Sequence, residues 1–509
     1  MNIRSHSLSG LPHNPVRSTN HKTVTLQLLH TNDMHGSLEP VDDKVILGRK
    51  TKLGGSAFLA SVMKKAQKQN PNTLVLDSGD SVSGQVASDL NQGRSMVAVM
   101  NRMPYSAATI GNHDFDFYVD SLEQRLAMAE YPVVLTNTTY QDGSPLPNTE
   151  PSRIIETPDL KVAVLGILTE DMDEVTLAEK REGIRFEDPE DALRREIPKM
   201  RAQGADVIVV MSHNGLKEDI DLAEDFPGQQ LIILGAHSHD RLTEPMEVEG
   251  NYVFQAGSHG KELGRVEVEI DPLADKIVNI HSELLLVDPA VIQPDEEVNM
   301  LVNGYVVEAE KALGEMVGQT PRTLDREYHT DSLLGNWVTD AMRERLGTDI
   351  ALINSDGLRA DLAGGQVTKG QVREVRPFDG MFLYKGEISG QSLKKVLEHS
   401  TSYRETEPGG RSSFLQVSGL EFSYDIQRPE GDRVFDVRVG DESLKLDRTY
   451  SLACENYLAS GQLGYQAMRD GEYQETGLTT LEVLEGFASS CSPNRLSESG
   501  RIRDLTGLS

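Results

Sequence analysis

Polar residues follow the apolar stretches in the first half of this chain in a regular order. Four runs rich in aliphatic and β-branched residues are typical of buried strands, at 25–29, 73–76, 207–210 and 231–234. Asp, His and Asn residues come just after these runs, or after a less apolar one, at Asp33, His35, Asp80, Asn112, His113, Asp114, His213, His237 and His239. Open α/β sheets place their binding sites at the loops that follow strands. The order therefore predicts one site assembled from five loops.

These residue types suit a pair of divalent cations. Two ions about 3.5–4 Å apart repel each other, and a shared carboxylate offsets that repulsion. Asp80 is the natural bridge. Neutral imidazoles and one amide oxygen complete the coordination without excess negative charge, which leaves positions for water and phosphate. Each motif alone is also compatible with an ordinary turn or a surface histidine. The five together favour a hydrolytic two-metal site.

The ordered motifs are similar to those of a known family. LLHTNDMHG, LDSGDSVSG, TIGNHDFDF, VVMSHNG and ILGAHSHD resemble the calcineurin-like metallophosphoesterases, and within them the bacterial and animal 5′-nucleotidases. The resemblance runs from Leu26 to about Arg501. It implies an α/β fold with an N-terminal four-layer α/β/β/α sandwich, a linker helix and a C-terminal α/β substrate domain. It also implies a metal-dependent phosphomonoesterase that acts on nucleoside monophosphates.

The resemblance assigns roles to individual residues of the first half. One ion would be held by Asp33, His35, Asp80 and His239, and the other by Asp80, Asn112, His213 and His237. Many relatives carry Gln or Asn where this chain has His239. His113 matches the transition-state histidine of the family, and Asp116 matches the carboxylate that orients it. The oxygen and nitrogen donors suit Mn²⁺, Zn²⁺, Co²⁺ or Fe²⁺.

Other polar residues near or outside the motifs receive no ligand role. Asn32 and Asn137 lie close to the motifs, but we do not assign either as a ligand. Four further histidines fall outside the pattern, and we interpret them as solvated or core-edge residues: His259, His281, His329 and His399.

A second block of motifs in the C-terminal half resembles the substrate domain of the same family. Its pieces include RTLDR, NSDGLR, RPF and YLASGQLGY. The resemblance implies substrate-binding roles for Arg322, Arg326, Asn354, Arg359, Phe378 and Tyr457. Arginines bind phosphate or carboxylate groups through a planar fork of donors. The two aromatic rings would stack on a flat base, although ordinary core packing also explains them.

The C-terminal block departs from the family pattern at two positions. Leu463 stands where relatives carry an Asp that accepts hydrogen bonds from ribose, and Gly380 replaces an Asn beside the base. Loss of a hydrogen-bonding partner alters selectivity strongly. A sugar phosphate or a sugar-phosphoglycerate is therefore an alternative substrate, and a 2′,3′-cyclic nucleotide phosphodiesterase with 3′-nucleotidase activity is another. The intact motifs disfavour a metal-binding scaffold without catalysis.

Changes of pattern along the chain predict two domains and a linker. We predict that residues 1–24 form a flexible arm and that residues 25–286 form the catalytic domain. Residues 287–318 are predicted to form a linker, and residues 319–505 the substrate domain. The linker contains a helical pattern from Glu296 to about Met316, introduced by Pro294. Beyond the linker, the pattern predicts a strand at residues 349–354 and a helix at 391–400. It also predicts two strands at 414–425, with a turn at Gly419.

Composition limits the partners. The formal charge of −30 disfavours a nucleic acid polymer, because such binding needs a basic surface. No run approaches the ~18–20 apolar residues of a membrane span, and no feature indicates an obligate protein partner. A small phosphorylated substrate is the expected partner. The first 24 residues lack the apolar core of a signal peptide, so we predict a cytoplasmic protein, or a periplasmic or secreted one if the N-terminus is misassigned.

Overall fold

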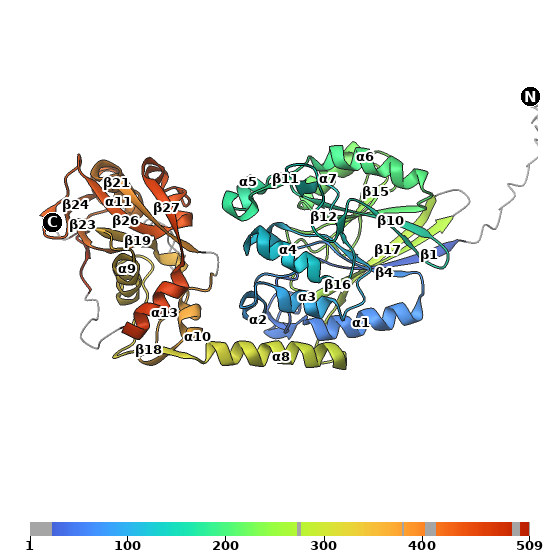
Figure 1. Ribbon diagram of the computed structural model, residues 1–509, viewed down its shortest axis with the longest axis horizontal. Coiled ribbons are helices and arrows are strands. Elements are labelled where there is room, and N and C mark those ends of the chain that lie inside the picture. The colour runs from blue at the N-terminus through green and yellow to red at the C-terminus, as the bar shows by residue number, and fades with distance from the viewer. Residues whose placement is uncertain (1–22, 272–275, 379–380, 403–413, 491–498, 508–509) are drawn as a thin grey trace, which may run out of the picture. The chain divides into compact units, whose positions relative to one another are not determined.

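The chain forms two compact units in a computed structural model (Figure 1). The structure describes residues 23–271, 276–378, 381–402, 414–490 and 499–507. Unit 1 is Met1–Tyr305 and unit 2 is Val306–Ser509. The division falls inside helix α8 (Glu296–Leu313), within the segment predicted as a linker. Most of the predicted N-terminal arm, residues 1–22, lies outside the described residues, and the bounds of the four predicted segments stay predictions.

Helix α8 ends earlier than its sequence pattern predicted. We expected it to continue to about Met316, but its last residue is Leu313. Gly314 follows, and glycine is a poor residue for continuing a helix. Met316 instead begins strand β18 (Met316–Thr320), which pairs antiparallel with β20 (Gly365–Thr368). Strand pairing therefore ends the helix before its amphipathic pattern stops.

Two sheets form the centre of unit 1 (Figure 1). The first has the order β17 (Lys276–Leu286), β16 (Glu262–Asp271), β1 (Val24–Thr31), β4 (Thr73–Asp77), β5 (Ala107–Ala108), β6 (Val133–Val134), β8 (Thr149–Glu150). The second has the order β14 (Met246–Val248), β15 (Asn251–Phe254), β13 (Ile232–Leu234), β12 (Val207–His213), β10 (Lys161–Leu168), β9 (Arg153–Glu156). The four apolar runs of the sequence are β1, β4, β12 and β13, as predicted.

Side-chain alternation along these strands builds two cores. In β12, Val209 packs with residues of β1 and β4 in the core between the sheets, whereas Ile208 and Val210 join a second core under the helices. Successive side chains of a strand point to opposite faces. Because both faces are buried, these parallel strands need apolar residues at every position. That requirement explains the continuous runs in the sequence.

Helices cover the outer faces of both sheets in unit 1. Helix α1 (Ser56–Gln69) contacts β4, while α6 (Pro189–Ala202) contacts β10 and α7 (Leu216–Asp225) contacts β15. Asp188 caps α6 by accepting hydrogen bonds from the backbone N–H groups of Glu190 and Asp191. The layers are therefore helix, sheet, sheet and helix, which confirms the predicted α/β/β/α sandwich.

The largest sheet of unit 2 has five strands. Its order is β22 (Leu415–Ser418), β19 (Ile350–Asn354), β26 (Thr449–Glu455), β21 (Phe382–Ser389), β27 (Glu472–Thr479). Side chains of α9 (Leu333–Leu346) and α13 (Thr480–Ser490) share one core with this sheet. Those of α11 (Gly390–Ser402) share another with it.

The sequence pattern also located several elements of unit 2. The predicted strand at 349–354 is β19, and the predicted helix at 391–400 is α11. The two strands predicted at 414–425 are β22 and β23 (Leu420–Tyr424), with Gly419 between them at φ +74°. They do not pair with each other, because β22 pairs with β19 and β23 belongs to a separate four-stranded sheet. A Cβ on Gly419 would lie 2.0 Å from the Asp349 carbonyl oxygen, so this turn needs glycine.

Cys454 is buried in β26, and Cys491 lies outside the described residues.

A buried ion pair joins β26 to the turn after helix α10 (Lys369–Val375) in unit 2. Arg376 and Glu455 are 3% and 1% exposed, and they form two parallel hydrogen bonds, of which Arg376 Nε to Glu455 Oε1 measures 2.9 Å. We predict that Glu455→Gln lowers the free energy of unfolding by about 3–5 kcal/mol, because it leaves a buried guanidinium without its counter-charge.

Chemical denaturation of the wild-type protein and of Glu455→Gln measures this loss of unfolding free energy. Glu442→Gln is the matched control, since Glu442 pairs at 2.7 Å with Lys445 on the exposed surface and such pairs contribute about 0–1 kcal/mol. Equal effects of the two substitutions would contradict the prediction.

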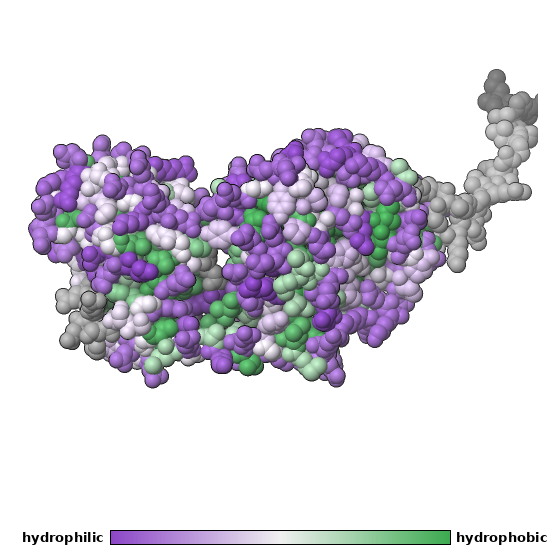
Figure 2. Space-filling view, in the orientation of Figure 1, coloured by the Kyte–Doolittle hydropathy of each residue, from purple (hydrophilic) through white to green (hydrophobic). Residues whose placement is uncertain are grey.

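The visible surface is largely hydrophilic (Figure 2). The sequence has 80 acidic residues against 50 basic ones, and Figure 2 shows hydrophilic side chains over most of the visible face. Among the residues that the structure describes, no helix is both long enough and apolar enough to span a bilayer.

Candidate metal centre

All seven predicted metal ligands lie at strand ends of unit 1. Asp33 and His35 follow β1, Asp80 follows β4, Asn112 begins the short helix η1 (Asn112–Phe115) after β5, His213 is the last residue of β12, and His237 and His239 follow β13. Strands of both sheets therefore contribute. Close approaches between their side chains connect the seven residues into one cluster.

Most of these residues share an unusual backbone conformation. The φ angles of Asp33, His35, Asp80, His237 and His239 are +49°, +46°, +55°, +73° and +59°. A left-handed backbone costs a non-glycine residue about 1 kcal/mol or more, and such residues cluster at functional sites. The surrounding fold therefore stabilises these loops in a conformation that their sequences do not favour.

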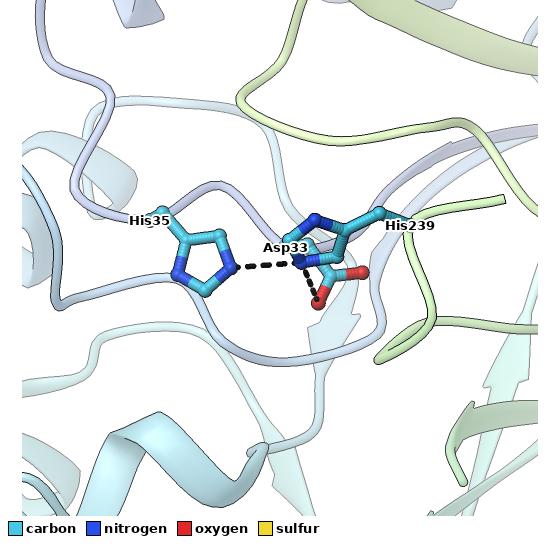
Figure 3. A group of neighbouring side chains, drawn as sticks. All are labelled: Asp33, His35 and His239. Atoms are coloured by element: carbon cyan, nitrogen blue, oxygen red, sulfur yellow. Dashed lines mark hydrogen bonds and ion pairs between the residues drawn. The ribbon is translucent and has the colours of Figure 1, made fainter. Parts of the chain in front are cut away.

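The first ligand group consists of Asp33, His35 and His239 (Figure 3). His35 Nε2 lies 3.0 Å from His239 Nε2, and His239 Nε2 lies 3.3 Å from Asp33 Oδ1. Asp33 is fully buried, whereas the His239 side chain is 40% exposed. The group therefore has a buried carboxylate on one side and solvent access on the other.

The second ligand group consists of Asp80, His213 and His237, with Asn112 between the two imidazoles. His213 Nε2 lies 3.2 Å from Asp80 Oδ2 and 3.2 Å from Asn112 Oδ1. His237 Nδ1 lies 2.9 Å from the same Asn112 oxygen. His213 Nε2 is also 4.0 Å from Asp33 Oδ1, so the two groups adjoin. The structure places Asp80 in the second group, and its bridging role stays a prediction.

The donor chemistry fits divalent ions. His35 Nδ1 donates to the Ser83 carbonyl oxygen at 3.2 Å, and His213 Nδ1 donates to that of Ser78 at 2.8 Å. Each Nε2 therefore faces the cluster, and it can offer a lone pair once a cation replaces any proton there, which is the usual arrangement of metal-binding histidines. A lone pair on His35 Nε2 that faces His239 Nε2 at 3.0 Å requires a cation or a proton between them.

A glycine allows the second group to close. A Cβ on Gly111 would lie 2.1 Å from Asp80 Oδ1 and 2.6 Å from His213 Nε2. Any larger residue would displace one of these donors. Asp114 further orders the loop, because its Oδ2 accepts hydrogen bonds from the backbone N–H of Gly111 at 2.8 Å and of Asp80 at 3.2 Å.

The electrostatics favour ionised carboxylates in the cluster. Burial raises the pKa of Asp80, but the charge and hydrogen bond of His213 outweigh it and bring that pKa well below its usual range. Burial also raises the pKa of Asp33, and the hydrogen bond with His239 leads the effects that lower it below its ordinary value. Ionised carboxylates bind hard and borderline cations well.

The predicted catalytic pair lies beside the first group. His113 Nδ1 is 2.9 Å from Asp116 Oδ2, and the His113 ring centroid is 5.3 Å from that of His35. Burial lowers the pKa of His113, but the Asp116 hydrogen bond and nearby negative charge raise it to about 9. Asp116 also accepts a hydrogen bond from Ser83 Oγ at 2.8 Å and lies 3.6 Å from Lys180 Nζ. The contact with Asp116 therefore orients the His113 ring and favours its protonated form.

A second buried carboxyl lies behind the cluster. Asp219 is fully buried, its Oδ1 accepts a hydrogen bond from Ser212 Oγ, and its Oδ2 has no partner among the described residues. Burial raises the pKa of Asp219 to about 8, against about 4 in an unfolded chain. The native carboxyl thus keeps its proton while the unfolded one loses it, and its contribution to stability falls as pH rises from about 4 to about 8.

We predict that Asp219→Asn makes the protein more stable than the wild type above about pH 8. The gain comes from the ionisation that the amide avoids, about 1.4 kcal/mol for each pKa unit between the unfolded and the native carboxyl, and it should be smallest near pH 4. Denaturant unfolding across this pH range, with a chelator present, measures it. Asp221→Asn on the exposed face of α7 should show no such trend. A gain that is independent of pH would contradict the assignment.

The predicted substrate residues of unit 2 do not all lie together. Arg359 and Phe378 are neighbours, with the guanidinium carbon 5.2 Å from the ring centroid, and Arg376 lies 4.5 Å from the same ring. Arg326 lies 5.4 Å from the Tyr328 ring centroid. The remaining predicted residues are Arg322, which is exposed, Asn354, buried at the end of β19, and Tyr457, which is 38% exposed.

Two residues of the cluster lacked a role in the sequence interpretation. His259 was interpreted as a solvated or core-edge histidine, but its ring centroid lies 5.2 Å from that of His35 and 6.1 Å from that of His239. Asn32, which was not assigned as a ligand, donates hydrogen bonds to Asp33 Oδ2 and to the Gly257 carbonyl oxygen, both at 2.7 Å. Nothing in the sequence near His259 resembles a ligand motif, and only its flanking glycines, Gly257 and Gly260, give a signal.

Family models match both units of the chain. Residues 26–241 match the calcineurin-like phosphoesterase model, and residues 309–470 match the 5′-nucleotidase C-terminal domain. The chain belongs to the 5′-nucleotidase family of calcineurin-like phosphoesterases. The family resemblance predicted from the motifs, and the fold that it implied, are therefore confirmed.

Individual family members align over most of this chain. Human 5′-nucleotidase is 27% identical, with 95% of this chain and 91% of the relative covered. The trifunctional nucleotide phosphoesterase protein YfkN of Bacillus subtilis is 29% identical over 94% of this chain. The crystal structure of a 5′-nucleotidase precursor from Thermus thermophilus is 29% identical, with a TM-score of 0.64 and coverage of 94% of this chain and 99% of that one.

Some of the relatives are much longer than this chain. The chain spans 35% of the length of YfkN, and 41% of the length of another Bacillus subtilis relative, the endonuclease YhcR.

Proposed function

We propose that this protein hydrolyses nucleoside 5′-monophosphates to a nucleoside and inorganic phosphate. The observation that carries the proposal is the juxtaposition of two adjoining ligand groups and an oriented histidine, His113, in one unit. A metal pair with a nearby proton donor is suited to phosphomonoester hydrolysis. Membership of the 5′-nucleotidase family, with relatives named 5′-nucleotidase, supports the nucleotide as substrate over the alternatives raised by the sequence.

Two divalent ions, when bound, would supply Lewis-acid activation of water and neutralise negative charge on the phosphoryl group. The chain's own residues would orient and protonate the substrate. His113 Nδ1 is committed to Asp116, so Nε2 is free to donate a proton to a phosphoryl oxygen or to the leaving 5′-alkoxide. Ser83 and Lys180 hold Asp116, which keeps the ring in the donating orientation. No phosphoenzyme is required.

The ions that this set would take are Mn²⁺, Zn²⁺, Co²⁺ or Fe²⁺. Four histidines, two aspartates and one asparagine offer nitrogen and oxygen donors without thiolates, which suits borderline divalent ions. Asp33, His35 and His239 would hold one ion, and Asp80, Asn112, His213 and His237 the other.

In unit 2, we propose that Arg359 and its neighbours contact the substrate. Arg359 Nε is buried and has no partner among the described residues, so an anionic or carbonyl group of a ligand would satisfy it. Leu463 has φ +56° and a carbonyl oxygen that accepts a hydrogen bond from His399 Nε2 at 2.9 Å. Its apolar side chain packs against the core of unit 2 and offers no hydrogen bond to a ribose. We therefore expect modest selectivity for the nucleoside.

Phosphate release tests the proposed function. Chelator-stripped protein is supplied again with Mn²⁺ or Zn²⁺ and assayed on AMP, 3′-AMP, 2′,3′-cyclic AMP, sugar phosphates and phosphoglycerate glycosides. We expect activity only after metal addition and a preference for AMP. A strong preference for a non-nucleotide ester would overturn the nucleotide assignment while keeping the hydrolase, and the absence of metal-dependent phosphate release would overturn both.

A small phosphorylated substrate is the partner that we propose, and cytoplasmic location stays a prediction.

A further inference from the structure

A short hairpin of unit 1 carries an apolar turn that the metal centre does not use. Strands β2 (Val41–Asp43) and β3 (Thr51–Leu53) pair antiparallel. The turn between them contains three consecutive aliphatic residues, Val45, Ile46 and Leu47. Val45 is 86% exposed and Leu47 is 37% exposed. Turns on a protein surface are normally polar, and a run of three apolar residues there is unfavourable unless it serves a function. The turn is therefore a candidate contact surface.

Hydrogen bonds hold this turn in its exposed conformation. Asp43 is buried, and its Oδ1 accepts hydrogen bonds from the backbone N–H groups of Val45 at 3.0 Å and Ile46 at 2.9 Å. An aspartate that bonds the backbone just after it forms a local turn of its own. The other oxygen of Asp43 lies 3.2 Å from Lys261 Nζ, which ties the turn to the loop before β16. The Gly48 backbone N–H donates to the Val45 carbonyl oxygen at 3.3 Å. The fold therefore presents Val45 to solvent through a defined backbone.

Basic side chains flank the apolar turn. Residues 41–53 contain four basic and two acidic residues, a net charge of +2 in a chain whose net charge is −30. One of the two acidic residues, Asp43, is already paired with Lys261. The four basic side chains are exposed, and none of them forms an ion pair with a described residue: Lys44, Arg49, Lys50 and Lys52. An anionic surface with an apolar interior matches both the free positive charge and the exposed aliphatic side chains.

We propose that the hairpin at residues 41–53 binds an anionic lipid surface. Val45 and Leu47 enter the boundary between head groups and acyl chains, and the basic side chains pair with lipid phosphates while their stems cover the apolar turn. Each basic side chain near such a surface strengthens binding by about fivefold. The contact is peripheral, and it gives this segment a role beyond the proposed hydrolysis.

A lipid surface fits the hairpin better than an acidic protein does. A stable protein interface buries about 800 Å² on each partner, from about 20–30 residues, whereas the apolar turn offers three residues. A bilayer needs no such area, because shallow insertion of a few apolar side chains together with several basic ones gives reversible binding. Charges more than about 8 Å from the lipid are largely screened at physiological ionic strength, so acidic surfaces elsewhere on the chain oppose the contact only weakly.

Vesicle flotation with the full chain tests the proposal. Vesicles of phosphatidylcholine alone are compared with vesicles that also contain phosphatidylglycerol, and we expect binding only to the second kind. The paired substitution Val45→Ser with Leu47→Ser removes the apolar contact, whereas Lys50→Gln with Lys52→Gln removes two positive charges. Each pair should lower the affinity for anionic vesicles by at least ~10-fold.

Control variants separate the hairpin from charge in general. Lys65→Gln with Lys68→Gln removes two exposed lysines from α1, and it should change vesicle binding far less than the hairpin pair does. All variants should unfold at the wild-type denaturant midpoint and release phosphate from AMP at the wild-type rate, because the hairpin contains no predicted ligand or catalytic residue. Vesicle binding and phosphate release are measured separately, so failure of one proposal leaves the other intact.

Three results would overturn the inference. One is a wild-type chain that binds neither kind of vesicle. Another is undiminished binding after Val45→Ser with Leu47→Ser, which would place the turn outside the contact. The third is binding of the wild-type chain to polyglutamate that is as tight as its binding to anionic vesicles, which would indicate an acidic protein as the partner.

Discussion

Replacing His113 by alanine is expected to lower kcat for nucleoside monophosphate hydrolysis by about 10²–10⁴-fold, the usual contribution of a positioned general acid. The ring is placed for proton donation, with Nδ1 bound to Asp116 at 2.9 Å and 46% of its side chain exposed. It is absent from both ligand groups. Metal content and KM should therefore change far less than kcat, which separates a proton donor from a metal ligand.

Steady-state phosphate release at saturating metal measures this effect. Asp116→Asn should have a smaller effect in the same direction, because the imidazole remains but loses the carboxylate that orients it. His281→Ala, which removes an exposed histidine from β17, should leave kcat unchanged. A His113→Ala protein that turns over at the wild-type rate would remove His113 from the mechanism.

Local sequence pattern was sufficient to predict four strands of unit 1 and the cluster of polar residues that follows them, whereas the ligand roles came from the family resemblance. The apolar runs are continuous because the strands are buried on both faces, and the polar residues that interrupt them mark the strand ends. Five loops could be assigned to one site because parallel strands end at the same edge of a sheet. Asp33 and Asp80 illustrate this, since β1 and β4 are parallel neighbours with Thr31 opposite Asp77.

His259 could not be predicted in the same way, because its position depends on an antiparallel pairing. Strand β16 runs antiparallel to β1, with His30 opposite Gly264, so the residues just before β16 lie beside those just after β1. His259 reaches the cluster through this pairing, and local pattern carries no information about the partner of β16. A signal was present in the glycines around His259, but glycine in a loop is too common to identify a site.

The candidate substrate residues of unit 2 were harder to place, for a related reason. The RPF motif places Arg376 two residues before Phe378, and its guanidinium carbon lies 4.5 Å from the Phe378 ring centroid. The motifs gave no sign, however, that Arg359 lies 5.2 Å from the same centroid or that Arg376 pairs with Glu455 in β26, which is distant in sequence. Contacts of this kind are set by tertiary packing rather than by motif spacing.

Replacing Asp80 by asparagine should have the second large effect, on metal binding itself. The change is isosteric and removes one negative charge. The backbone contacts of Asp80, from its N–H to Asp114 and from His35 N–H to its carbonyl oxygen, do not involve the carboxylate. Its Oδ1 can still accept the hydrogen bond from the His113 N–H, now 2.8 Å long. The fold should therefore survive while the anionic donor is lost.

We expect Asp80→Asn to lower the affinity for at least one ion by more than the ~10–100-fold that loss of an outer partner causes. Phosphate release should fall with it, and excess metal should restore activity only in part. Elemental analysis after dialysis and calorimetric titration measure the change, with Asp120→Asn on the exposed surface of helix α4 (Tyr118–Met128) as control. If Asp80 bridges the two ions, both sites weaken together. If one site weakens alone, Asp80 serves only the group of His213 and His237. Retention of both ions at wild-type affinity would exclude Asp80 as a ligand.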